Sequence, residues 1–173
     1  MAFHLEREFI LEYCRIRALI GIADFLKYII TSEGFSDFSA YLQHTVKLPI
    51  KSVGGGILFH GSLKPLDFLT CAKSAVEKHI YATNNANYAI FLSVTDIQEG
   101  GAASVHVSKN EFSITAGFIN GESKISKGFV HIVSEDGFRA TSNSEYVCEG
   151  TIPVLFSMPV CFEDLTEKVF VKS

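Results

Sequence analysis

A turn-forming cluster at residues 51–56, KSVGGG, divides the chain into two parts with different patterns. Before it, residues 3–30 carry apolar side chains three and four positions apart, which predicts amphipathic helix, and Gly21 predicts a break in that helix. After it, short apolar runs alternate with glycine and polar residues, which is typical of β-strands. The pattern predicts an α+β fold with an N-terminal helical segment at residues 1–50 and a β-rich core at residues 51–173, built as one compact unit.

Individual elements follow from the same patterns. A second short helix is expected before residue 48, capped by Ser36 or Asp37. A loop and helix are expected over residues 65–78, and another helix, capped by Thr83 or Asn84, is expected to run through Leu92. Seven short strands with antiparallel pairing are expected at residues 57–59, 80–82, 103–107, 111–116, 128–133, 146–147 and 152–156.

Composition narrows the possible functions. The 173 residues are 47% hydrophobic, which is enough apolar material for one domain with a real core. A net charge of −4 gives no global positive field that would draw the protein to nucleic acid or an acidic membrane. The four cysteines show no metal-binding spacing among themselves or with the six histidines, so no metal is expected.

The sequence also indicates where in the cell the protein is located. The start, MAFHLEREF, lacks the basic and then apolar pattern of a secretory signal, and the apolar stretch 16–30 is interrupted by Arg17, Asp24 and Lys27. We therefore expect a protein without a membrane span, located in the cytoplasm or delivered into the cytoplasm of a target cell. Scattered cysteines fit a reducing compartment.

Polar side chains lie at the ends of three predicted strands. The run ILFHGS ends in His60, Gly61 and Ser62, the run HIYAT carries Tyr81, and SEYV carries Glu145. Each residue type is more often structural when it stands alone. Together they suit a flat carboxamide ligand, because glycine lets a ligand approach the main-chain N–H and C=O, serine adds a hydroxyl, and a tyrosine ring can stack.

The remaining candidates surround this trio. Tyr88 or Phe91, on the helix after Tyr81, is expected to close the other side of the ring site, and the choice between them is open. A fixed carboxylate such as Glu145 stabilises positive charge that develops at an anomeric carbon.

The segments ILFHGS, HIYATNNANYAIFLS and SEYV, in this order, resemble the signature of the ADP-ribosyltransferase superfamily. The likeness is to the histidine, tyrosine, glutamate branch that includes poly(ADP-ribose) polymerases and diphtheria-type toxins, and it spans roughly residues 53–160. It implies a split antiparallel β-sheet and NAD as the substrate. It also implies roles for three residues: His60 binds the adenosine ribose, Tyr81 stacks on nicotinamide, and Glu145 binds the ribose of the cleaved bond. Gly61 and Ser62 would receive the carboxamide.

Two positions depart from the pattern of the family. Relatives usually place the second stacking aromatic where this chain has Leu92, and many carry Glu or Gln where this chain has Asn143. The resemblance implies a mono-ADP-ribosyltransferase acting on a protein or nucleic-acid acceptor. On this frame Asn143 is the candidate for orienting the acceptor, and acceptor recognition is expected in the polar loop 134–144. The expected setting of the transferase is a bacterial or phage-conflict toxin, with an antitoxin or immunity protein as a possible partner. NAD glycohydrolysis, RNA 2′-phosphate transfer and a non-catalytic NAD-binding or interaction module are the alternatives.

Overall fold

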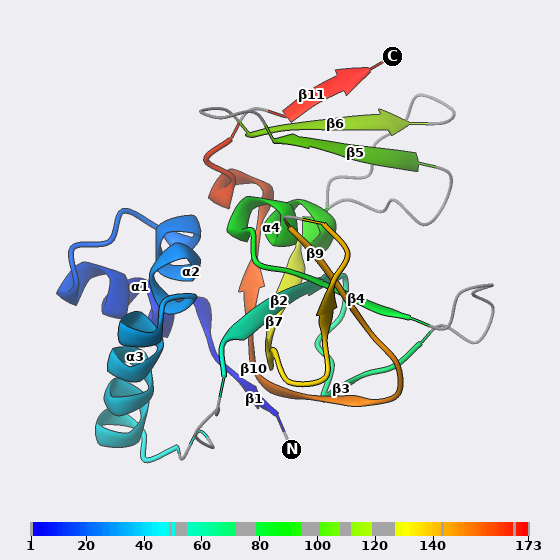
Figure 1. Ribbon diagram of the computed structural model, residues 1–173. Helices are drawn as coiled ribbons and strands as arrows, with labels where there is room; N and C mark the ends of the chain where they lie inside the picture. Colours follow the sequence, from blue (N-terminus) through cyan, green and yellow to red (C-terminus); the bar gives the residue numbers. More distant parts are fainter. Residues whose placement is uncertain are drawn as a thin grey trace.

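The computed structural model shows an α+β fold with a mostly antiparallel open sheet and four α-helices among the residues it describes (Figure 1). These residues are 2–48, 50, 55–71, 79–94, 101–107, 112–118, 127–142, 144–167 and 169–172. The predicted fold class is therefore confirmed at the level of secondary structure and strand pairing.

The N-terminal segment contains helices α1 (Arg7–Ile16), α2 (Ile22–Ile29) and α3 (Ser32–Thr45). The predicted break is confirmed, because Gly21 occupies the N-cap position of α2. The prediction of a helix from residue 3 was wrong at its start: Phe3–His4 form strand β1, which pairs with Phe156 and Ser157 in parallel orientation. The predicted cap of the next helix was also wrong, because α3 starts earlier and the Thr31 hydroxyl accepts its first side-chain bond, from the Gly34 N–H at 3.0 Å.

The central sheet has the strand order β1-β10-β7-β2-β4-β9-β8, and β3 pairs with β10 beside it. A second sheet has the order β11-β6-β5. The strands are β2 (Ile57–Ser62), β3 (Phe68–Leu69), β4 (Ile80–Thr83), β5 (Gly101–Val107), β6 (Phe112–Phe118), β7 (Gly128–Ser134), β8 (Arg139–Ala140), β9 (Glu145–Cys148), β10 (Ile152–Val160) and β11 (Val169–Lys172).

All seven predicted strands are confirmed, while β1, β3, β8 and β11 were not predicted. Three of these are two residues long, too short for an alternating pattern to stand out. The helix predicted within residues 65–78 is wrong at Leu69, which lies in β3, and its residues 72–78 lie outside the described part of the chain.

Helix α4 (Ala86–Val94) lies against β2 and β7, between the two sheets (Figure 1). Its cap is Asn85 and not Thr83 or Asn84 as predicted, because the Asn85 side-chain oxygen accepts the Tyr88 N–H at 3.0 Å. The helix packs very closely on the sheet. A Cβ added to Gly61 would lie 2.4 Å from the Ala89 carbonyl oxygen, and one added to Gly128 would lie 1.7 Å from the Ser93 carbonyl oxygen.

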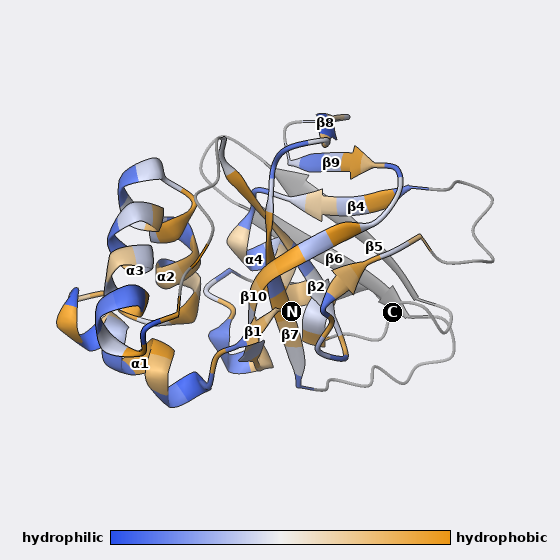
Figure 2. Ribbon diagram, turned by 90° about the horizontal axis from the view of Figure 1, so that it is seen from below, coloured by the Kyte–Doolittle hydropathy of each residue, from blue (hydrophilic) through white to orange (hydrophobic). Residues whose placement is uncertain are grey.

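The helical segment and the β-rich part share one hydrophobic core. Its buried members include Phe25 from α2, Phe38 from α3, Phe59 from β2 and Phe156 from β10, and Figure 2 shows apolar residues along these elements. A smaller cluster covers the opposite face of the sheet and includes Leu58, Leu69, Ile80, Val133 and Val154. The shared core fixes the helices to the strands that carry the site described below.

An ion pair joins the start of α1 to the segment that follows β10. The Arg7 guanidinium donates two hydrogen bonds of 2.6 Å to the carboxylate of Asp164, in the short 3₁₀ helix Phe162–Asp164. In the described segments, no helix has the length and apolar character needed to cross a bilayer.

Candidate functional site

Strand β2 is paired very differently along its two edges. Toward β7 it forms six register pairs, from Ile57 with Ser134 to Ser62 with Phe129. Toward β4 it forms a single pair, Phe59 with Thr83. The two strands thus form a fork rather than a continuous ladder.

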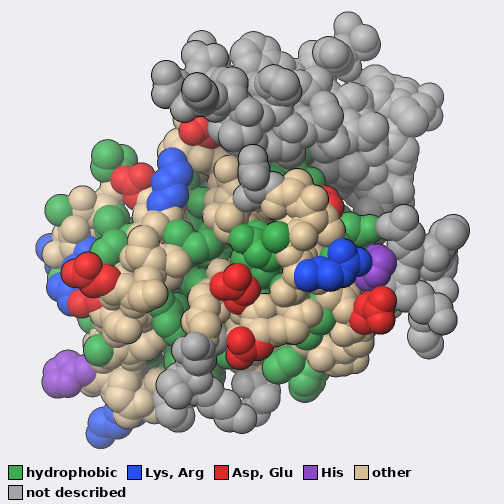
Figure 3. Space-filling view, in the orientation of Figure 1, with side chains coloured by type: hydrophobic (Ala, Val, Ile, Leu, Met, Phe, Trp, Pro, Cys, Tyr) green, Lys and Arg blue, Asp and Glu red, His purple; other side chains and the backbone are tan. Residues whose placement is uncertain are grey.

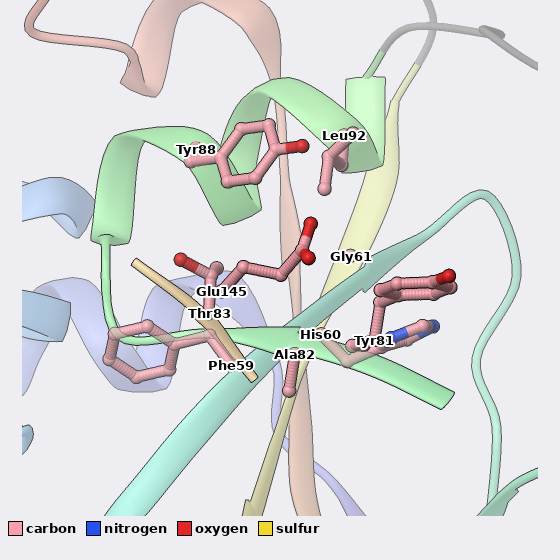
Figure 4. Close-up of a pocket in the computed structure, with 9 residues that line it drawn as sticks. All are labelled: Phe59, His60, Gly61, Tyr81, Ala82, Thr83, Tyr88, Leu92 and Glu145. Carbon is pink, nitrogen blue, oxygen red and sulfur yellow. Dashed lines mark hydrogen bonds between the residues drawn. The ribbon is translucent and has the colours of Figure 1, made fainter. Parts of the chain in front are cut away.

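A cavity of about 230 Å³ lies in this fork, under α4 (Figure 4). Strands β2, β4 and β9 and helix α4 supply its lining residues: Phe59, His60, Gly61, Tyr81, Ala82, Thr83, Tyr88, Leu92 and Glu145. Residues that lie up to 86 positions apart in the sequence therefore share one cavity.

Five of the sequence-predicted site residues line this cavity: His60, Gly61, Tyr81, Tyr88 and Glu145. Ser62 and Phe91 do not line it, and Asn143 lies outside the described residues. Figure 4 shows the Glu145 carboxylate in the middle of the cavity, with Tyr88 and Leu92 above it and Tyr81 beside His60.

Tyr88 and Phe91, the two candidates for the second aromatic, lie differently relative to the cavity. Each residue of a helix turns by about 100°, so Phe91 and Leu92 lie on opposite sides of the direction in which Tyr88 points. Leu92 is on the cavity side, whereas Phe91 is fully buried away from it. Tyr88 is therefore the aromatic wall from this helix, and Leu92 is a lining residue that the prediction noted only as a departure.

His60 presents an acceptor nitrogen. Its Nδ1–H donates to the main-chain carbonyl of Tyr81 at 2.7 Å, since a carbonyl can only accept. Burial lowers the pKa of His60, which favours the neutral ring, and in this tautomer Nε2 keeps its lone pair. The ring is suited to accept a hydrogen bond from a ligand hydroxyl.

Ser62, predicted as a carboxamide ligand, does not line the cavity and has partners of its own. Its hydroxyl donates to the carbonyl of Lys64 at 2.6 Å and accepts from Nε2–H of His131 at 2.7 Å. Its one proton is therefore already used by the Lys64 carbonyl. Sequence reasoning missed His131, because a histidine within an apolar strand run carries no signal of its own.

Gly61 also has a structural reason to be glycine. The space on its α4 side is filled by the carbonyl of Ala89 and by Ser93, so any side chain there would collide with the helix. What Gly61 offers the cavity is its main chain, at the fork between β2 and β4.

Glu145 is held by its neighbours at the start of β9. The Thr141 hydroxyl donates to Glu145 Oε1 at 2.8 Å, and the Ser142 hydroxyl accepts the Glu145 N–H at 3.1 Å. Across the cavity, burial and, to a lesser extent, the Glu145 charge raise the pKa of Tyr88. The Tyr88 phenol therefore stays protonated and uncharged at neutral pH.

No group of three metal-binding side chains gathers anywhere in the described segments. Comparison of the chain with known protein families, curated proteins and solved structures found no match. A function for the protein must therefore be inferred from the geometry of the cavity and from the sequence motifs that form it.

Proposed function

We propose that the protein is a mono-ADP-ribosyltransferase with an ADP-ribosyltransferase-like split sheet, which cleaves NAD and transfers ADP-ribose to a macromolecular acceptor. The observation that carries the proposal is the convergence of His60, Tyr81 and Glu145, from three separate strands, on one cavity. The order of the motifs around these residues, which resembles that of the superfamily, supports the same conclusion.

The cavity suits one end of a dinucleotide. Pockets that enclose a drug-sized ligand measure about 300–1,000 Å³. At about 230 Å³, this cavity matches the nicotinamide and its ribose, and the rest of NAD would extend through the opening. Tyr81 and Tyr88 supply aromatic surfaces for the nicotinamide ring, and the Gly61 main chain binds its carboxamide. Nε2 of His60 accepts a hydrogen bond from a hydroxyl of the adenosine ribose.

The chemistry needs a fixed negative charge. When the bond between C1′ and the nicotinamide nitrogen breaks, its electron pair leaves with nicotinamide and positive charge develops on the ribose. The Glu145 carboxylate, bonded to the ribose 2′-hydroxyl, stabilises that charge. A nucleophile of the acceptor then forms a bond to C1′ with its lone pair and loses its proton.

The acceptor is a protein or a nucleic acid, and the biological setting in this proposal is a bacterial or phage-conflict effector working in a cytoplasm. Figure 3 shows acidic, basic and hydrophobic side chains interspersed over the described part of one face, without a broad basic patch. Together with the net charge of −4, this favours recognition by local contacts over general attraction to phosphate backbones.

The test is incubation with NAD carrying a label in its ADP-ribose part and separate pools of cell protein, RNA and DNA. Label in one pool, together with nicotinamide release, identifies the acceptor, and Glu145→Gln is expected to slow release by about 10²- to 10³-fold. Free ADP-ribose alone would make the protein an NAD glycohydrolase. If the protein neither bound NAD nor turned it over, the proposal would be refuted and a non-catalytic module would be favoured. Full activity of Glu145→Gln would refute the mechanism.

A further inference from the structure

The turn that leads into β9 is bonded to the Glu145 main chain. The main-chain N–H groups of Thr141 and Ser142 both point to the Glu145 carbonyl oxygen, at 2.9 and 3.4 Å. The Ser142 hydroxyl in turn accepts the Glu145 N–H at 3.1 Å. Donors and acceptors on both sides of the turn thus fix the backbone from which the carboxylate projects.

Thr141 adds a bond to the carboxylate itself. Its hydroxyl lies 2.8 Å from Glu145 Oε1 and 3.3 Å from the Glu145 main-chain oxygen, and it has one proton to donate. The shorter contact, to a charged acceptor, is the stronger bond. The main-chain oxygen already receives the Thr141 N–H, so it does not need the hydroxyl.

The bond from Thr141 makes the two carboxylate oxygens of Glu145 different. Oε1 is engaged by Thr141, which leaves Oε2 as the oxygen that is free of this bond. A glutamate side chain has three rotatable bonds, and an anchor at one oxygen selects the conformation that reaches into the cavity (Figure 4).

We propose that Thr141 is a positioning residue that holds the Glu145 carboxylate toward the ribose of the bound dinucleotide. This inference rests on the proposed function for its effect on turnover, but its structural content concerns Glu145 alone. Because charge on the ribose appears only as the glycosidic bond breaks, loss of the anchor lowers kcat more than it weakens NAD binding.

The matched variants are Thr141→Val, which keeps the shape and removes the hydroxyl, and Thr141→Ser, which keeps the hydroxyl. For nicotinamide release we expect Thr141→Val to lower kcat by about tenfold, with KM for NAD changed by less than about threefold. Thr141→Ser should keep most of the wild-type kcat. Unchanged kcat in Thr141→Val, or equal losses in both variants, would overturn the inference.

A second measurement separates this inference from the proposed function. Three-bond scalar couplings of the Glu145 side chain, measured by NMR without NAD, report its rotamer populations. We expect one dominant rotamer in the wild type and in Thr141→Ser, and averaged couplings in Thr141→Val. If the wild type released no nicotinamide, the proposed function would fail while these couplings still judged the role of Thr141. Equal couplings in all three proteins would refute that role.

Discussion

The two edges of β2 show how one strand serves both structure and binding. Its β7 edge is a continuous ladder, and Val130–Val133 of β7 beside it are buried. Its β4 edge has one register pair, and a cavity occupies the remaining space. Main-chain groups that pair with a neighbouring strand cannot also serve a ligand, so the site lies where the ladder is interrupted.

Two histidines that are paired in register, one on β2 and one on β7, differ in the same way as the two edges. His60 on β2 lies opposite His131 on β7, with ring centroids 6.0 Å apart. His60 lines the cavity with an acceptor nitrogen. His131 is fully buried and donates to Ser62, and its Nδ1 has no hydrogen-bond partner among the described residues. The same residue type is a candidate ligand group at the open edge and a structural group at the closed one.

Truncation of the buried side of α4 should have the largest effect. Phe91→Ala removes a fully buried ring and leaves a cavity, so we expect the free energy of unfolding to fall by about 3–5 kcal/mol. Chemical denaturation measures this. Tyr88→Leu, on the cavity side of the same helix, is the comparison and should cost much less. Similar losses in the two variants would mean that the cavity wall is as tightly packed as the core.

The second-largest effect is expected at the β7 edge of β2, where low pH should lower the free energy of unfolding through His131. Burial, and to a lesser extent the electrostatic effect of nearby His60, lower the pKa of His131 to about 4, below the value of about 6.5 for an exposed histidine. Between these pH values the unfolded chain takes up a proton that the native protein does not. The contribution of His131 to stability is therefore complete above about pH 6.5 and falls by up to about 1.4 kcal/mol per pH unit as the pH approaches 4.

The measurement is the free energy of unfolding against pH for the wild type and for His131→Gln, whose amide can still donate to Ser62. The difference between the two slopes isolates His131 from the other titrating groups. We expect the wild type to lose stability more steeply below pH 6.5. Parallel curves would show that His131 is not held neutral in the native protein.

The smallest effect is expected at the cavity wall and depends on the proposed function. Tyr88→Leu removes a ring that would contact nicotinamide, and aromatic pairing contributes about 0.5–1.5 kcal/mol beyond the buried area. KM for NAD should rise by about two- to tenfold, with Tyr88→Phe close to the wild type because it keeps the ring. A wild-type KM in Tyr88→Leu would exclude this ring from nicotinamide binding.

Much of the fold could be predicted from the sequence, because the hydrophobic period of each long element is a local property. The break at Gly21 and the strands around His60, Tyr81 and Glu145 followed from such patterns. The caps at Thr31 and Asn85 did not, since several neighbouring residues had suitable side chains and only the backbone path selects one. Strand β1 was missed because pairing with distant β10 stabilises it.

The sequence by itself determined which residues are candidates for the site, because the motifs place polar side chains at the ends of predicted strands. Only the tertiary structure decided where these residues lie and what they bond to. It assigned Tyr88 to the cavity and Phe91 to the interior, engaged Ser62 with His131, and joined Thr141 to Glu145. The physical reason is that a hydroxyl proton or a ring face can serve one partner at a time, and strand register and helix packing determine which partner is near.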